Sequence, residues 1–320
     1  MGNAAQAAWY GKHPAWSDYV PDSHQPPDGE PLRDWVKQGR DYLARTDPKG
    51  AERGESFYLF APKETDLLFC GVLAPSSDGG KPPRIFPLTI YVPLVRRRYR
   101  RAYPLLPAYA AQAWDEMRLA QQKCLASDKA AEVERILGGL APAIPAAGWG
   151  AWRRFRRDVS TVGAADFVGT LHPAGAGPAL DLLARLAESI APFRDSRLGP
   201  PTLAFDLPVS SVLKTAAYQT AFWLRVCESG LGRQAGQPSF FMHASQDGRR
   251  LSLFLRQPDP ADYARVLAGV GDPGTVHRLD AEGLPVHAAL RSGAEAIVNG
   301  SKSVSDLFKA RWDRLLRGAR

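Results

Sequence analysis

The spacing of apolar residues along the chain changes between two periods, and each period predicts a different kind of element. Short apolar runs bounded by turn-forming residues predict strands in the first third. They lie at 7–12, 57–61, 67–73 and 85–94. The link between the second and third runs is short and polar, as a hairpin requires. We therefore expect neighbouring antiparallel strands rather than parallel crossovers.

Apolar residues three and four positions apart predict one helix in the first third and several in the middle of the chain. These are expected at 31–43, 104–125, 129–140, 148–159, 178–190 and 212–228. Strand patterns return at 202–207 and in a second hairpin, 239–244 with 250–255. A helix then begins with Asp259 as N-cap and Pro260, and ends at Gly271. After a loose stretch, Ser303 and Asp306 form a capping-box pattern that starts a last helix, Val304–Leu316.

This order of elements predicts an α/β fold with a mixed, partly antiparallel sheet and helices on both faces, an αβα sandwich. We expect one α/β domain over 1–272, with a hinge at the Pro- and Ala-rich segment 141–148 between an N-terminal and a C-terminal half. Residues 273–320 are expected to be a C-terminal extension that carries an amphipathic helix.

Composition narrows the protein class. The 320 residues are 45% hydrophobic and 23% charged, so a sizeable core is expected. No apolar run reaches about 18 residues, and the first residues lack the pattern of a signal peptide. The cysteines, Cys70, Cys124 and Cys227, are widely spaced in apolar contexts, which predicts buried free thiols in a reducing, cytoplasmic compartment.

The motifs of common catalytic sites are missing from the sequence. Gly79-Gly80-Lys81 is followed by two prolines, which exclude the helix of a phosphate-binding loop. The six histidines are scattered, and no pair has the spacing of helical metal ligands. His243 is interpreted as a core histidine, and Asp18, Asp22 and Asp28 as turn-forming residues beside prolines. We expect no catalytic residue, no metal and no cofactor.

The net charge of +8 is concentrated in arginine clusters, at 96–101, at 153–157 and near the C-terminus. Such clusters suit an acidic protein or a membrane surface. Trp152 and Phe155 interleave with arginines, a pattern that also occurs in nucleic-acid binding. At helical spacing, however, these aromatic residues form one buried face, so a plain solvated arginine face is the first interpretation. Nucleic acid is the least favoured partner.

Two segments resemble the type VI secretion-associated TagF/ImpM family. YGKHPAWSDYV at 10–20 is similar to the family's opening, GKLPSRGDFV, and GVLAPSSDGGKPPRIFPLTI at 71–90 is similar to its GVLMPSVDRVGRYFPLT. A third, weaker resemblance to PDPxxFxxLL begins at Pro258. This chain differs at His13, at Trp16-Ser17 and by two added residues between Asp78 and Arg84.

The resemblance implies a cytoplasmic, bacterial, non-enzymatic protein that regulates a type VI secretion system after translation, as a repressor. It implies binding to the forkhead-associated scaffold protein of that system. The expected location is the cytoplasm, or alternatively the periphery of the inner membrane through the secretion apparatus. The residues expected at the partner surface are Lys12, Asp18, Ser76, Asp78, Lys81 and Arg84.

Three alternatives stay open at this stage. Arg84 pairing with Asp78 or Asp18 would make these residues a brace between the two loops, without contact to a partner. An enzyme of another type would use Lys12, Lys81 and Arg84 to hold an anionic substrate beside His13 or His243 as base. A basic module would bind a membrane or a nucleic acid through Arg96–Arg101.

Overall fold

The computed structural model describes residues 6–20, 29–47, 54–145, 150–194, 201–269, 276–281 and 283–317. Its centre is an eight-stranded sheet in the order β1-β4-β3-β2-β6-β7-β5-β8. All neighbours pair antiparallel except β5 and β8, which are parallel. The strands are β1 Ala8–Gly11, β2 Ser56–Phe60, β3 Leu67–Ala74, β4 Leu88–Val95, β5 Ala204–Val209, β6 Ser239–Ser245, β7 Gly248–Phe254 and β8 His277–Arg278. The predicted α/β class and the antiparallel meander are confirmed.

The meander β2–β3–β4 has one correction. The apolar pattern predicted a strand from residue 85, but β4 begins at Leu88. Ile85 makes only an isolated bridge with Ser77. Pro87 has no N–H to give to a ladder, so regular pairing starts after it.

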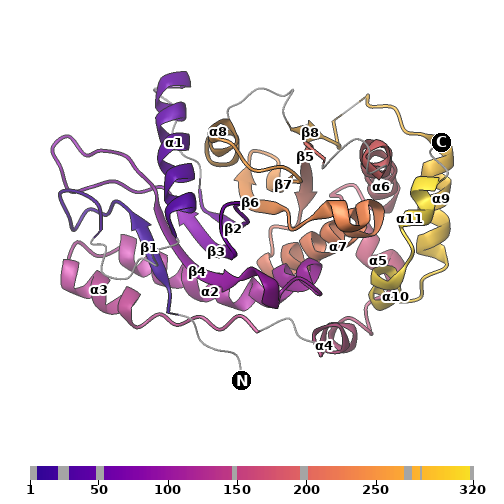
Figure 1. The fold of residues 1–320 in the computed structure, drawn as a ribbon, viewed down its shortest axis with the longest axis horizontal. Coiled ribbons are helices and arrows are strands. Elements are labelled where there is room, and N and C mark those ends of the chain that lie inside the picture. Colours follow the sequence, from indigo (N-terminus) through magenta and orange to yellow (C-terminus); the bar gives the residue numbers. More distant parts are fainter. Residues whose placement is uncertain are drawn as a thin grey trace.

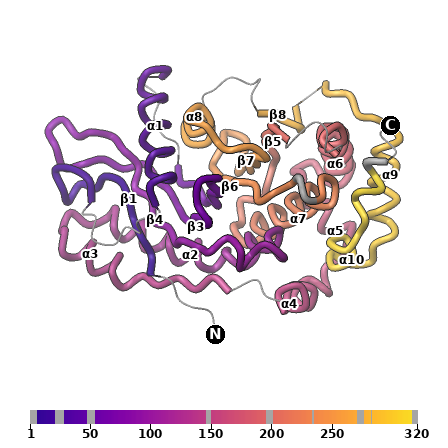
Figure 2. The backbone as a smooth tube through the Cα atoms, viewed as in Figure 1, coloured from indigo at the N-terminus to yellow at the C-terminus, as the bar shows by residue number. Residues whose placement is uncertain are grey.

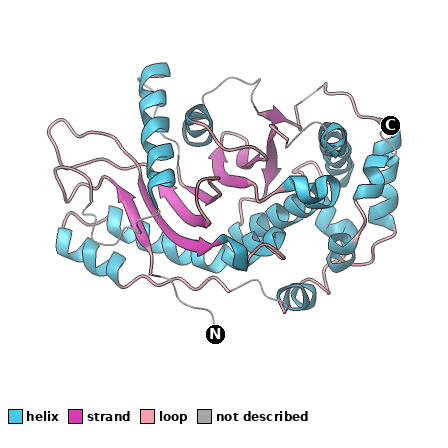
Figure 3. Cartoon of the chain, viewed as in Figure 1, coloured by secondary structure: helices cyan, strands magenta, loops and turns pink. Residues whose placement is uncertain are grey.

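Two helices cover one face of the sheet (Figures 1 and 3). These are α1 Glu30–Thr46 and α8 Pro260–Ala268, which pack on each other. Trp35 of α1 lies between Phe241 of β6 and Tyr263 of α8, and its Nε1–H donates to Asp259 O (3.0 Å). The predicted N-cap at Asp259 is confirmed as a capping box, but the helix ends at Gly269 in the left-handed conformation, not at Gly271.

The opposite face carries the thicker helical layer and the larger core. Helices α2 Leu106–Leu125 and α7 Leu213–Leu231 pack against each other and the sheet, with Trp114 and Trp223 fully buried. The other helices of this layer are α3 Ala130–Gly138, α4 Ala151–Asp158, α5 Ala164–Gly169, α6 Ala176–Ile190, α9 Ala288–Asn299, α10 Val304–Lys309 and α11 Asp313–Arg317. Helices therefore flank both faces of the sheet, as predicted. No helix among the described residues is long and apolar enough to cross a lipid bilayer.

The sequence pattern failed mainly toward the C-terminus. The stretch read as loose contains α9, whose buried residues Leu290, Ala294 and Val298 are four positions apart. The last helix is broken, because Ala310 adopts an extended conformation and turns Trp312 into the core. Helix α5 was also not predicted. The capping box of Ser303 and Asp306 is confirmed.

The division into 1–272 and 273–320 stays a prediction. Leu290, Phe308 and Trp312 belong to the same hydrophobic cluster as the residues of α2 and α7. Of the expected hinge, 141–145 has no regular structure and 146–148 lies outside the described residues, as do Asp22 and Asp28.

Candidate functional site

The two sequence motifs fold into two loops at one edge of the sheet. Residues 12–20 leave β1 and close on themselves through a bridge between Lys12 and Tyr19 and a bond from Val20 N to Gly11 O (2.9 Å). Residues 75–87 join β3 to β4 and close through the Ser77–Ile85 bridge. Figure 2 shows both loops side by side at the left edge, in indigo and purple. We call the pair the brace loops.

The carboxylate of Asp78 holds the brace loops together. Its Oδ2 accepts from Lys12 Nζ (2.9 Å) and from Arg84 Nε (2.5 Å). Its Oδ1 accepts from the backbone N–H of Arg84 (2.8 Å) and of Gly80 (3.1 Å). The Asp78 side chain is completely buried, so its carboxylate is shielded from water, while the Arg84 side chain that reaches it stays exposed.

Arg84 adds a second connection between the loops. Its Nη2 donates to Ser17 O (2.7 Å) and lies 3.4 Å from Asp18 Oδ1. The backbone N–H of Gly79 also donates to Trp16 O (2.8 Å). Arg84 was expected to pair with Asp78 or with Asp18, and in the structure it contacts both carboxylates.

These bonds fix the charge state of Asp78. The backbone N–H of Arg84, and next the Lys12 ammonium, hold the pKa of the Asp78 carboxyl well below its usual range. The hydrogen bond between the Arg84 side chain and Asp78 in turn raises the pKa of Arg84. Asp78 is thus ionised at all physiological pH values, and it acts as an acceptor rather than as an acid.

Burial separates the six residues expected at a partner surface into two groups. Lys12 and Asp78 are buried and point at each other. Asp18, Lys81 and Arg84 are exposed, and Ser76 is half-buried. Direct contact with a partner would come from the exposed group, while Lys12 and Asp78 set its geometry. The partner role itself stays a prediction.

The apolar side chains of this surface were not among the predicted site residues. Tyr19 stacks on Tyr10 with ring centroids 5.5 Å apart, and Phe86 meets both rings edge-on. Tyr19 stays 37% exposed and the neighbouring Ile85 55% exposed. They are among the few large apolar side chains at the described surface. The only signal in the sequence was their place within the motifs.

The two predicted bases, His13 and His243, are both held by hydrogen bonds within the fold. His13 is buried, its Nδ1 accepts from Ala15 N–H (3.1 Å), and its Nε2 is therefore the protonated nitrogen that donates to Cys124 O (2.8 Å). Burial lowers the pKa of His13. Both ring nitrogens are thus occupied. His243 lies on β6, four strands from β1 and therefore about 20 Å away.

A separate cavity of about 460 Å³ lies beside His243, between α8 and the β5 edge of the sheet. Its central cation, Arg250, is 4% exposed and donates to Asp206 Oδ1 (2.9 Å) and to both carboxylate oxygens of Asp280. His243 Nε2 bonds to Ser252 Oγ (3.0 Å), and burial lowers its pKa. The geometry is that of a buried, paired network, and it agrees with the interpretation of His243 as a core histidine.

Comparisons with known proteins add little. No protein-family model matches the sequence, and no curated protein matches it. Among solved structures, the crystal structure of PA0076 from Pseudomonas aeruginosa PAO1 is similar, with 21% identity and a TM-score of 0.36. The match covers 45% of this chain and 64% of that one, which is less than two thirds of its length. A likeness at this level leaves both family and function open.

Proposed function

We propose that this chain is a non-enzymatic accessory protein of a bacterial type VI secretion system. In this proposal it represses the system after translation by binding the forkhead-associated scaffold protein. The system and the scaffold come from the resemblance of the two motifs to the TagF/ImpM family. The proposed contact surface consists of the exposed parts of the brace loops: Asp18, Tyr19, Lys81, Arg84 and Ile85.

One observation carries the choice of this surface. The two motifs lie about 60 residues apart in the chain, yet the buried Asp78 carboxylate ties them into one unit. A surface that is fixed before binding loses little conformational entropy when a partner docks. Around this fixed centre, Tyr19 and Ile85 offer apolar contact area beside the charges of Asp18 and Arg84. This combination of apolar anchors with a polar rim is typical of protein interfaces.

The test is binding of the purified chain to the forkhead-associated scaffold protein, measured by calorimetry. The variant Tyr19→Ser/Ile85→Ser removes the apolar anchors and leaves Lys12, Asp78 and Arg84 in place. We expect its affinity to fall at least about 10-fold, since a central anchor contributes more than about 1 kcal/mol.

The matched control is Leu119→Ser/Val212→Ser, which removes two apolar side chains of similar exposure elsewhere on the surface. This control should bind like the unmodified chain. If the Tyr19/Ile85 variant is folded and binds as tightly as the control, the brace loops are not the contact surface. If the unmodified chain does not bind the scaffold at all, the proposed partner is wrong.

A further inference from the structure

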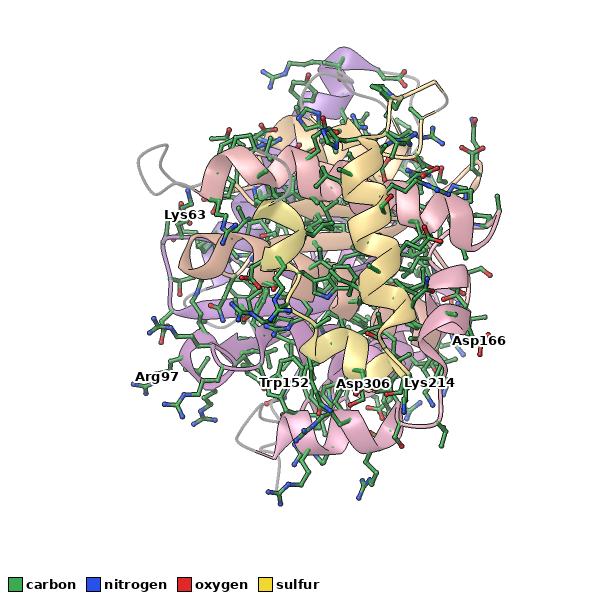
Figure 4. The ribbon with its side chains drawn as sticks, turned by 90° about the vertical axis from the view of Figure 1, so that its right-hand side faces the viewer. Lys63, Arg97, Trp152, Asp166, Lys214 and Asp306 are labelled. Atoms are coloured by element: carbon green, nitrogen blue, oxygen red, sulfur yellow. The ribbon has the colours of Figure 1, made fainter. Side chains whose placement is uncertain are left out.

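Two arginine clusters that lie more than 50 residues apart in the chain form one surface in the structure. The first follows β4 through the 3₁₀ turn Arg96–Arg98 (η2), and the second is helix α4. Trp152 of α4 joins them, because its Nε1–H donates to Arg101 O (3.3 Å). Helix α4 also packs on the 3₁₀ turn Tyr103–Leu105 (η3). Figure 4 shows Arg97 pointing outward at the lower left and Trp152 on the upper side of α4, which lies at the lower edge.

The joined surface is strongly cationic. Arg96 is not part of it, since its guanidinium is half-buried and donates to Pro62 O and Leu67 O. Eight arginines are exposed on it: Arg97, Arg98, Arg100, Arg101, Arg153, Arg154, Arg156 and Arg157. We call these eight the arginine surface. Arg157 lies 3.6 Å from Asp158, while Arg97, Arg98, Arg100 and Arg153 form no ion pair within the described part of the chain.

The aromatic residues of the arginine surface are not available for stacking on bases. Phe155 is buried between Tyr218 and Phe308. Trp152 packs edge-on against Phe155, and the Arg225 guanidinium lies 5.5 Å from its ring centroid. Single-stranded nucleic acid is usually held by free aromatic faces beside cations. The arginine surface has the cations without those faces.

The arginine surface also lacks the apolar anchor of a protein interface. The large exposed apolar side chains of the described residues are Tyr19, Ile85, Leu119, Val162, Val212 and Leu284, and none belongs to 96–101 or 151–158. The apolar face of α4, Ala151 and Phe155, is turned into the core, so the helix has nothing to insert into a bilayer. What remains is an array of exposed guanidinium groups, of which Arg154 lies over the Tyr109 ring and Arg156 donates to Trp152 O.

We propose that the arginine surface binds the surface of an anionic lipid bilayer. Lipid headgroups diffuse laterally, so anionic lipids gather under fixed cations without any shape complementarity. Clusters of several basic residues are typical of such peripheral binding. The proposal does not depend on the scaffold protein or on the brace loops.

The test is co-sedimentation of the full chain with vesicles at 50 mM NaCl. The vesicles contain phosphatidylcholine and phosphatidylglycerol at 3:1, and vesicles of pure phosphatidylcholine serve as the neutral reference. Two variants neutralise the two halves of the surface separately, Arg97→Gln/Arg98→Gln/Arg100→Gln and Arg153→Gln/Arg156→Gln/Arg157→Gln. The matched control, Arg45→Gln/Arg135→Gln/Arg314→Gln, changes the net charge equally at exposed sites on α1, α3 and α11.

We expect the unmodified chain and the control to bind the anionic vesicles alike, and to be released at 500 mM NaCl. Each half-surface variant should lose about 100-fold in partition coefficient, since each arginine near the membrane contributes about fivefold. Thermal melting of each variant shows that it is folded.

Several results would overturn the proposal. They are absence of binding to anionic vesicles at 50 mM NaCl, equal binding to neutral vesicles, and a half-surface variant that binds like the control. Tighter binding of the chain to a 30-base-pair DNA duplex than to the vesicles at equal salt would assign the surface to nucleic acid instead.

Discussion

Gly11→Ala is the substitution that most directly tests how β1 supports the brace loops. Gly11 has φ of +135°, a conformation that side chains other than that of glycine rarely adopt. A Cβ atom there would lie 1.9 Å from Pro87 O and 2.9 Å from Leu88 Cα. Both are backbone atoms at the start of β4, so no side chain can rotate away. The end of β1 would have to move away from β4 by about 1.5 Å to restore an ordinary contact.

The magnitude follows from two contributions. Backbone strain at a position with positive φ is about 1–2 kcal/mol for a residue with a Cβ. Parting β1 from β4 also disturbs Trp9, which is 3% exposed and pairs with Ile90. Complete loss of a buried tryptophan destabilises by about 3–5 kcal/mol, and we expect about half of that for a partial displacement. The free energy of unfolding should therefore fall by about 3 kcal/mol.

Urea unfolding followed by tryptophan fluorescence gives this free energy, and hydrogen exchange of peptides over 6–20 and 71–95 shows whether the loss begins locally. The matched control is Gly177→Ala in α6, where a Cβ would meet nothing within 4 Å. It should stabilise by up to about 1 kcal/mol, because alanine has the higher helix propensity. A Gly11→Ala protein within about 0.5 kcal/mol of the unmodified chain would refute the steric reasoning.

Two further predictions concern titratable groups. The buried thiols of Cys70, Cys124 and Cys227 should resist a thiol reagent until the chain unfolds. Burial raises the pKa of Cys124 and of Cys227 to about 12, which leaves about a thousandfold less of the reactive thiolate. Fast labelling of the native chain would contradict this. Lowering the pH from 7.5 to 5.5 should destabilise the fold, because burial lowers the pKa of His13 and the unfolded state therefore binds a proton there first. The free energy of unfolding should fall by at most about 1.4 kcal/mol per pH unit below about pH 6.5. Urea midpoints at the two pH values measure this loss, which should be smaller in His13→Asn; an unchanged pH slope in that variant would remove His13 as a cause.

The elements with local signals could be predicted from the sequence. Asp259 and Ser303 both cap their helices as expected, because a capping box involves residues only three positions apart. The hairpin β6–β7 turns at Gln246–Asp247, between the two strands predicted at 239–244 and 250–255. The free, buried cysteines followed from their apolar neighbours.

Features that depend on distant residues could not be predicted in the same way. The break at Ala310 arises because Trp312 finds a place in the core beside Phe222, and nothing in the local pattern indicates that contact. Arg96 is a second example. In the sequence it is one of five clustered arginines, but its guanidinium donates to Pro62 O and Leu67 O and is half-buried. For the site, the pairing of Asp78 with Arg84 could be predicted, whereas the buried position of Lys12 and the exposed Tyr19 and Ile85 could not.

Strand β4 relates the two proposed surfaces to each other. It begins at Leu88, directly after the brace loops, and ends at Val95, directly before the arginine surface. Its eight residues span about 26 Å, which separates the two surfaces along the strand. If both proposals hold, the chain should bind the scaffold and anionic vesicles at the same time. The scaffold protein should co-sediment with vesicle-bound chain, and its affinity should stay within about threefold of the value without vesicles. Mutually exclusive binding would show that the two surfaces overlap or that one of them is assigned wrongly.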